Sequence, residues 1–360
     1  MPWLRSLHLY SGLFLSLFLA ALGLSGTVLL YKEDLWRLRY PELREPPAII
    51  TVEEHARSLD RIAQLFPGEA IRQVKFPRSG TPAYHVYLGD GEALVSQDGG
   101  RIIARWSRAS DVLGFLTDLH INLFAGRPGR NIAGIIGLAT ALMALSGLVL
   151  WWPQRKRFSI RSVAPRRLHR ASLLALHRDL GALASPLIVL FAVTGSGVVF
   201  YGASRALLNG MMGDPVPAVT PPVIAAEHPV GMADAAVIEV AATAVPGAQL
   251  MSYYPPAGAS AIHYFRLRQH GEVHPNGRSM AFVNGNDGSL VAAVDATRQP
   301  PGERAAQWLY PLHSATIGGE PYRLVAAALG LALAVMAGTG PVTWWQFRRR
   351  RANASRHRKE

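Results

Sequence analysis

Residues 176–201 read LHRDLGALASPLIVLFAVTGSGVVFY, and residues 7–31 read LHLYSGLFLSLFLAALGLSGTVLLY. Both stretches begin with Leu-His, carry a glycine four residues after the histidine (Gly12 and Gly181), and end in a patch of small residues. Each is long enough to cross a bilayer core, which needs about 20 apolar residues. The same membrane-spanning design therefore occurs twice in one chain.

Two further apolar runs contain no charged residue and end at Trp-Trp pairs, as is typical of a membrane interface. The whole chain has only 17% charged residues, against about a quarter in a soluble domain. We therefore predict a membrane α-helical fold with four transmembrane helices in two pseudo-symmetric halves. The predicted helices are 1–31, 132–152, 177–204 and 324–347, with large loops at 32–131 and 205–323, a short loop at 153–176 and a tail at 348–360.

The net charge of +13 is concentrated in the 153–176 loop and in the 348–360 tail, whereas the two large loops mix acids and bases. Short basic segments stay on the cytoplasmic side of a membrane. Both termini are therefore expected in the cytoplasm and the large loops outside it. The basic tail is interpreted as a topology signal rather than a nucleic-acid arm. The first span is expected to be an uncleaved anchor, because its apolar stretch exceeds that of a signal peptide.

Each large loop repeats one order of predicted elements. Helices at 52–66 and 232–245 both end at Pro-Gly. Alternating runs follow, IRQVKF and YHVYL in the first loop and LMSYY and IHYFRL in the second. The segments EALVSQDGGRIIA and MAFVNGNDGSLVAAV then predict hairpins turned at Asp-Gly. Each loop is thus predicted to form a small α+β module.

Four of the 12 histidines occupy repeat-related positions. His8 and His177 begin spans on the cytoplasmic side, and His120 and His313 precede spans on the external side, each ahead of Gly-x-Pro-x-Arg. A pseudo-twofold axis along the membrane normal would bring equivalent residues face to face. Two opposed neutral imidazoles are what a six-coordinate b-type haem requires. The pattern favours two haems b, one near each face of the membrane.

Residues around the histidines fit this interpretation. Gly12 and Gly181 lie one turn beyond the cytoplasmic histidines, where the lack of a side chain would let a flat macrocycle approach the backbone. Arginines are candidate partners of the haem propionates: Arg5 and Arg178 on the inner side, and Arg127, Arg130 and Arg323 on the outer side. A two-histidine metal site and a proton relay remain as alternatives. The chain has no cysteine, which excludes covalently attached haem and thiolate-ligated clusters.

The sequence offers no site for a cytosolic reductant, because no dinucleotide fingerprint is present. The glycines of the spans, including Gly23, Gly26, Gly195 and Gly197, are interpreted as helix-packing residues. Electrons would come from another protein or from quinol. The rival functions are non-redox: a siderophore permease, or a regulator that binds a periplasmic peptidase. A permease would need polar residues along a path, and these spans have almost none.

The repeated order of span, module and span, with LHRDLG, TG near the span exit and LH…GR before the next span, resembles the PepSY-associated transmembrane family over roughly residues 3–350. Within it, the chain looks most like inner-membrane ferric-siderophore reductases of the FoxB ferrioxamine-reductase type. It departs from the family at LHLYSG in the first span, where a His-Arg pair is frequent.

The resemblance implies a bacterial inner-membrane protein with two b haems, which reduces a ferric siderophore, of hydroxamate type, in the periplasm. Carried over residue by residue, His8, His120, His177 and His313 become ligands of the haem iron. No catalytic residue is predicted in the protein itself. Four tyrosines are candidates for the siderophore docking surface: Tyr253, Tyr254, Tyr310 and Tyr322.

Overall fold

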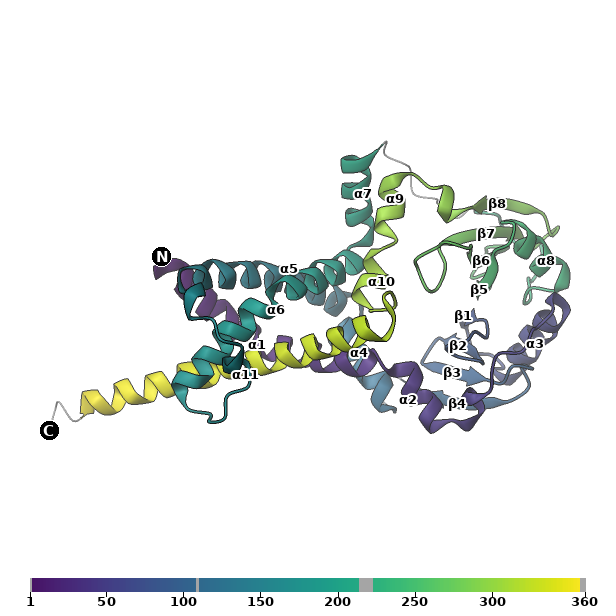
Figure 1. The fold of residues 1–360 in the computed structure, drawn as a ribbon. Helices are drawn as coiled ribbons and strands as arrows, with labels where there is room; N and C mark the ends of the chain where they lie inside the picture. Colours follow the sequence, from purple (N-terminus) through teal and green to yellow (C-terminus); the bar gives the residue numbers. More distant parts are fainter. Residues whose placement is uncertain (1, 108–109, 214–222, 357–360) are drawn as a thin grey trace. The chain divides into compact units, whose positions relative to one another are not determined.

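The computed structural model describes residues 2–107, 110–213 and 223–356. The chain divides into two compact units, each built from segments of both halves of the sequence (Figure 1). We call them the helix bundle (1–30, 116–201 and 312–360) and the sheet unit (31–115 and 202–311). Parts of the predicted second loop (214–222) and of the basic tail (357–360) lie outside the described residues.

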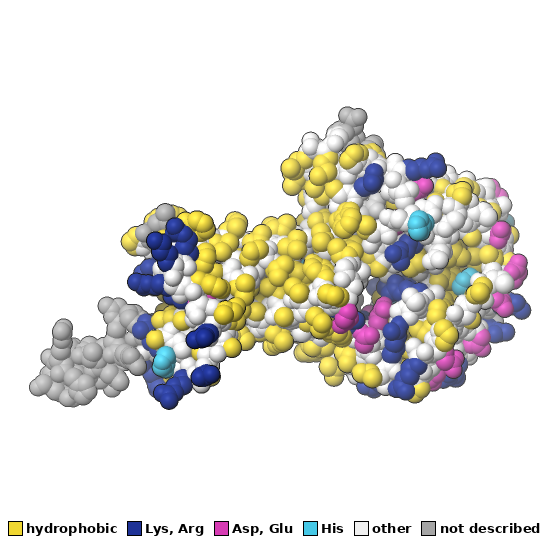
Figure 2. Space-filling model, viewed as in Figure 1, with side chains coloured by type: hydrophobic (Ala, Val, Ile, Leu, Met, Phe, Trp, Pro, Cys, Tyr) yellow, Lys and Arg dark blue, Asp and Glu magenta, His cyan; other side chains and the backbone are white. Residues whose placement is uncertain are grey.

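Four helices of the bundle are long and apolar enough to cross a membrane, and the chain is a multi-pass membrane protein. Apolar side chains cover the visible face of this bundle (Figure 2), as a lipid-facing surface requires. The helices are α1 (Pro2–Leu29), α5 (Gly126–Trp151), α6 (Arg170–Val199) and α11 (Gly319–Arg356). Together with the antiparallel sheet, they confirm the predicted fold class.

The second and fourth spans begin earlier than predicted, because Gly-x-Pro-x-Arg forms the first turn of each helix rather than a break before it. Proline is tolerated there, since the first-turn N–H groups have no helical partner. The breaks lie just upstream, where Phe124 (φ 61°) and Ala315 (φ 50°) adopt left-handed backbone. They follow the short helices α4 (Val112–Asn122) and α10 (Leu309–His313).

The bundle pairs α1 with α11 and α5 with α6. At the first crossing, a Cβ added to Gly23 would lie 2.7 Å from the carbonyl oxygen of Gly330. At the second, a Cβ added to Gly137 would meet the hydroxyl of Ser196. Small residues thus let the helix backbones approach closely, and the two crossings are equivalent under the repeat.

The sheet unit contains one eight-stranded antiparallel sheet, in the order β4-β3-β2-β1-β5-β6-β7-β8. The two predicted modules are therefore not separate: β1 pairs with β5 through Val74–Tyr253 and Lys75–Ser252. The strands are β1 (Ile71–Lys75), β2 (Tyr84–Leu88), β3 (Glu92–Val95), β4 (Ile102–Trp106), β5 (Gln249–Tyr254), β6 (Ile262–Arg268), β7 (Ser279–Asn284) and β8 (Leu290–Val294).

Helices α3 (Val52–Leu65) and α8 (Ala235–Thr243) pack together on one face of this sheet (Figure 1). Their core joins Leu59 and Ile238 to Val74 and Phe265 of the strands. Because strand side chains alternate between faces, the neighbours of these core residues in each strand lie on the opposite face. That opposite face carries polar and charged groups.

The remaining short helices connect these elements. They are α2 (Lys32–Arg39), η1 (Pro41–Arg44), η2 (Trp152–Arg157), η3 (Ile160–Val163), α7 (Tyr201–Met212), η4 (Ala296–Arg298) and α9 (Pro301–Ala306).

Candidate functional site

The structure brings the four repeat-related histidines together as two pairs inside the helix bundle. The ring centroids of His8 and His177 lie 6.5 Å apart, with an interplanar angle of 82°. Those of His120 and His313 lie 6.1 Å apart, at 32°. We call His8 and His177 the proximal pair, because they lie near the N-terminal ends of α1 and α6. His120 and His313, from α4 and α10, form the distal pair.

Each imidazole of the proximal pair bonds through Nδ1 to a hydroxyl on a neighbouring span. His8 Nδ1 lies 2.9 Å from Ser146 Oγ, and His177 Nδ1 lies 3.2 Å from Thr339 Oγ1. Both hydroxyls donate their own hydrogen to a carbonyl of their helix, at 2.8 Å and 3.1 Å. The hydroxyl oxygens are thus left to accept, so Nδ1 of each histidine carries the proton.

The distal pair bonds instead to backbone carbonyls. His313 Nδ1 lies 3.0 Å from the oxygen of Phe191, and His120 Nδ1 lies 3.1 Å from that of Leu22. Since a carbonyl oxygen can only accept, Nδ1 must donate. His120 Nδ1 is also 3.1 Å from Ser25 Oγ. In all four histidines, therefore, Nε2 is the nitrogen whose lone pair remains available to a metal.

A helix glycine lies against each imidazole. A Cβ added to Gly26 would lie 2.9 Å from His120 Cε1, and one added to Gly195 would lie 2.6 Å from His313 Cε1. Gly147 stands in the same relation to His8, at 3.1 Å, and Gly340 to His177 at 3.9 Å. Gly26, Gly195 and Gly147 thus make room for their imidazoles, whereas the distance at Gly340 is an ordinary van der Waals contact. For Gly26 and Gly195 this is a more specific role than the predicted helix packing.

The centroid separation in both pairs matches the span of one iron held between two imidazoles. A metal–imidazole nitrogen bond is about 2.0 Å long, and the ring centroid lies about 1.1 Å behind that nitrogen, so opposed ligands of one iron have centroids about 6 Å apart. The observed separations are 6.5 Å and 6.1 Å. A non-haem centre with several protein ligands has less support, because no group of three or more His, Asp or Glu side chains suited to a metal occurs among the described residues.

The predicted glycine pair beside the proximal histidines faces a methionine on each side. A Cβ on Gly12 would lie 3.6 Å from Met143 Sδ, and one on Gly181 would lie 3.6 Å from Met336 Sδ. Both are ordinary van der Waals distances. The packing of the protein would therefore accept a larger residue than glycine at both positions. The close approach of a macrocycle to Gly12 and Gly181 stays a prediction.

Of the five arginines predicted to bind propionates, two bond to the protein and three are exposed. Arg178 forms a 2.7 Å ion pair with the buried carboxylate of Asp179 and donates to the carbonyl of Arg157 at 3.0 Å. Arg323 donates to the carbonyl of Leu30 at 2.9 Å, which ties α11 to the end of α1. The other three are exposed: Arg5, Arg127 and Arg130.

The hydroxyls of two predicted docking tyrosines, Tyr253 and Tyr322, contact polar groups of the protein, and Tyr253 is fully buried. Tyr253 lies in the sheet core, where its hydroxyl accepts from the Ala233 N–H at 3.0 Å and lies 2.9 Å from His263 Nδ1. It therefore cannot form part of a docking surface, and the prediction is wrong for this residue. Tyr322 donates to the carbonyl of Leu312 at 2.9 Å.

The other two tyrosines, Tyr254 and Tyr310, are half-buried. Tyr254 stacks on Tyr264 with centroids 4.7 Å apart, and Tyr310 stacks on His274 at 4.9 Å. His274 is itself buried.

Ser146 and Thr339 were not predicted from the sequence, although the repeat contains them. Each is followed by glycine and stands five residues before the first tryptophan of a Trp-Trp pair. A hydroxyl at a repeat-related position inside an apolar span could have indicated a hydrogen-bonded site, because a polar group in lipid needs a partner.

The family model described as the PepSY-associated TM region matches residues 5–346. The matched range contains both histidine pairs, the whole sheet unit and all four spans except the first three residues of α1. No curated protein matches the chain.

Proposed function

The chain belongs to the PepSY-associated transmembrane family, and we propose that it is a di-haem b reductase. It passes electrons across the bacterial inner membrane to a ferric siderophore in the periplasm. The observation that carries the proposal is the pairing of four histidines, each with Nδ1 bonded to the protein and Nε2 left to a metal. A regulator or a permease has no use for this arrangement.

Haem b, when bound, supplies a one-electron Fe(III)/Fe(II) couple at each pair. The protein's part is to hold and orient the ligands. In each pair, the groups that accept from Nδ1 lie on neighbouring helices and fix the plane of the ring. With the proton held on Nδ1, each imidazole stays neutral and leaves Nε2 to the metal. Glycines bring the helices close to the rings, and lipid-facing apolar side chains keep water away from the bundle.

The direction of transfer rests on the charge distribution. The 153–176 loop and the tail are rich in Lys and Arg, which favours a cytoplasmic position for them and for both termini. The proximal pair then serves as the entry side, for electrons from quinol or a cytosolic reductase, and the distal pair as the exit side. The acceptor is the Fe(III) of a hydroxamate-type chelate, which takes one electron and leaves the chelator as Fe(II).

The first test is the colour of the purified full-length protein. We expect Soret and α bands that shift on dithionite reduction, and two haems b per chain by extraction. His8→Ala and His177→Ala should each remove one and the same haem, and His120→Ala and His313→Ala the other. His228→Ala is the matched control, because His228 is exposed.

A colourless protein would exclude the proposal in favour of a permease or a peptidase regulator. Loss of the same haem from His8→Ala and His120→Ala would keep the cofactor but overturn the pairing. The substrate is tested separately: dithionite-reduced protein is mixed with ferric chelates, and Fe(II) is trapped with a coloured ligand. Reoxidation by none of the ferric siderophores would restrict the proposal to transmembrane electron transfer.

A further inference from the structure

A row of polar residues crosses the face of the sheet opposite α3 and α8. Lys75 of β1 stands in register with His85 of β2 on one side and with Ser252 of β5 on the other, and Ser252 is in register with Arg266 of β6. Adjacent strands are about 4.8 Å apart, so these side chains are near neighbours. The row crosses the junction between the two halves of the sheet.

Lys75 is the centre of this row and has few partners. Its ammonium donates to the hydroxyl of Tyr87 at 2.9 Å and lies 5.0 Å from the centroid of the same ring. Within the described residues, Tyr87 is its only hydrogen-bond partner, and no carboxylate lies within ion-pair distance. Burial raises the pKa of the Tyr87 hydroxyl well above its ordinary value, so this phenol stays neutral and supplies no countercharge.

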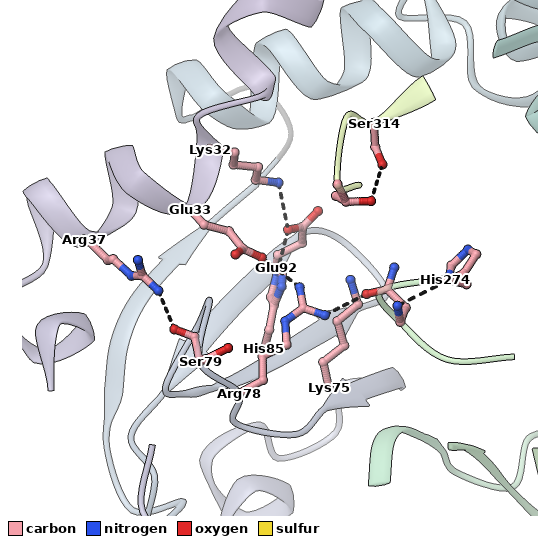
Figure 3. Close-up of polar contacts among 12 residues, drawn as sticks. Lys32, Glu33, Arg37, Lys75, Arg78, Ser79, His85, Glu92, His274 and Ser314 are labelled. Carbon is pink, nitrogen blue, oxygen red and sulfur yellow. Dashed lines mark hydrogen bonds and ion pairs between the residues drawn. The ribbon is translucent and has the colours of Figure 1, made fainter. Parts of the chain in front are cut away.

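Two other cations, Arg78 and Lys32, lie near Lys75 (Figure 3). Arg78 pairs with Glu33 at 2.8 Å and donates to the amide oxygen of Asn276 at 2.7 Å. Lys32 lies 3.8 Å from Glu92 and 4.7 Å from the centroid of Trp36.

The two carboxylates near Lys75, Arg78 and Lys32 already have partners. Glu33 is paired with Arg78, and Glu92 accepts from His85 Nε2 at 2.8 Å as well as facing Lys32. Burial, reinforced by the charges of Arg78 and Lys32, lowers the pKa of Lys75 to about 7. A half-buried ammonium among other cations is destabilised for want of an anion.

Solvent reaches the cluster, since the side chains of Lys32 and Arg78 keep 20% and 28% of their exposure. We propose that Lys75, Arg78 and Lys32 form a binding site for a small carboxylate ligand on this face of the sheet. The ammonium of Lys75 would pair with one carboxylate oxygen. The positive charges of Arg78 and Lys32, which keep their own partners, would add to the attraction. The site lies within the sheet unit and is independent of the haem proposal.

The test is calorimetric titration of the full-length, detergent-solubilised protein with oxalate, a compact dicarboxylate that is fully ionised near neutral pH. We expect saturable binding at one site per chain. Lys75→Met, which keeps the length of the side chain and removes its charge, should weaken binding by about tenfold or more. Arg78→Gln should weaken it as well, and it provides a second measurement if the Lys75 variant fails to fold.

Arg72→Gln is the matched control, because Arg72 is an exposed cation of the same strand, at the bulge between Ile71 and Gln73. It should leave the oxalate affinity unchanged. Two results would overturn the proposal: no saturable oxalate binding to the native protein, or equal weakening by Lys75→Met and Arg72→Gln, which indicates general charge attraction. Haem content, measured in the same samples, reports separately on the proposed electron-transfer function.

Discussion

His8 Nδ1 lies 2.9 Å from Oγ of Ser146, a residue of the second membrane helix. The hydroxyl accepts the imidazole proton and so gives the ring a more electron-rich Nε2, which favours Fe(III) over Fe(II) in a bound haem. We expect Ser146→Ala to raise the midpoint potential of one haem by an amount on the order of tens of millivolts, the equivalent of one hydrogen bond. An optical redox titration measures both haems.

Ser16→Ala is the control for this variant, because Ser16 donates to the carbonyl of Leu13 in its own helix. Its potentials should match those of the native protein. An unchanged potential in Ser146→Ala would show that Ser146 only helps to pack the spans.

Gly195→Ala is expected to disrupt the distal pair alone. The added Cβ would lie 2.6 Å from His313 Cε1, closer than a methyl group and a ring carbon can stand, so the imidazole must move. The expected result is loss of the distal haem with the proximal haem retained, measured by haem content and by the reduced spectrum.

Gly338→Ala, in the fourth span, is the matched substitution, because a Cβ there would have no atom of the described residues within 4 Å. Both haems should remain. Retention of both haems in Gly195→Ala would contradict the assignment of His313 as a ligand held in place by this glycine.

Acid should destabilise the sheet unit through its buried histidines. Burial lowers the pKa of His85 to about 4, although its hydrogen bond to Glu92 opposes the shift. The unfolded chain then binds a proton below about pH 6.5, whereas the folded protein does so only near pH 4. The stability contributed by neutral His85 is full above pH 6.5 and falls by roughly 3 kcal/mol in total as the pH drops to 4.

Thermal unfolding followed by tryptophan fluorescence measures this effect, since Trp36 lies 5.2 Å from His85, centroid to centroid. His85→Gln should flatten the pH dependence between 6.5 and 4, because the glutamine amide can still donate to Glu92. His228→Gln, at an exposed position, should not. Equal slopes in the two variants would show that His85 does not carry the effect.

Oxalate affinity should fall as the pH rises through 7. A carboxylate binds the ammonium form of Lys75, whose pKa in the ligand-free protein is about 7, so affinity is constant below that pH and decreases above it. Lys75 is faced by seven charged or titratable groups: Tyr87, Arg78, Lys32, Glu92, Glu33, His85 and His274. Calorimetry between pH 6 and 9 measures the change. A flat profile would assign binding to Arg78 and Lys32 without Lys75.

Much of the fold follows from the sequence because its signals are local. Uncharged apolar runs predicted the four spans, which the structure confirms, and alternation predicted the strands of both loops. The internal repeat predicted which histidines face each other, since symmetry relates distant positions without any knowledge of packing. The repeat also contained Ser146 and Thr339, whose role required the helix neighbours to be known.

Only the tertiary structure decided how elements distant in the chain meet. It joined the two predicted modules through β1 and β5 into one sheet, because strand alternation gives the faces of a strand but not the partner at its edge. It placed Tyr253 in the core and Arg178 in an ion pair with Asp179. It also placed Arg78 and Lys32 near Lys75, on one face of the sheet. The sequence by itself determined the spans and the histidine repeat, while the contacts that tune those histidines depend on which helices pack together.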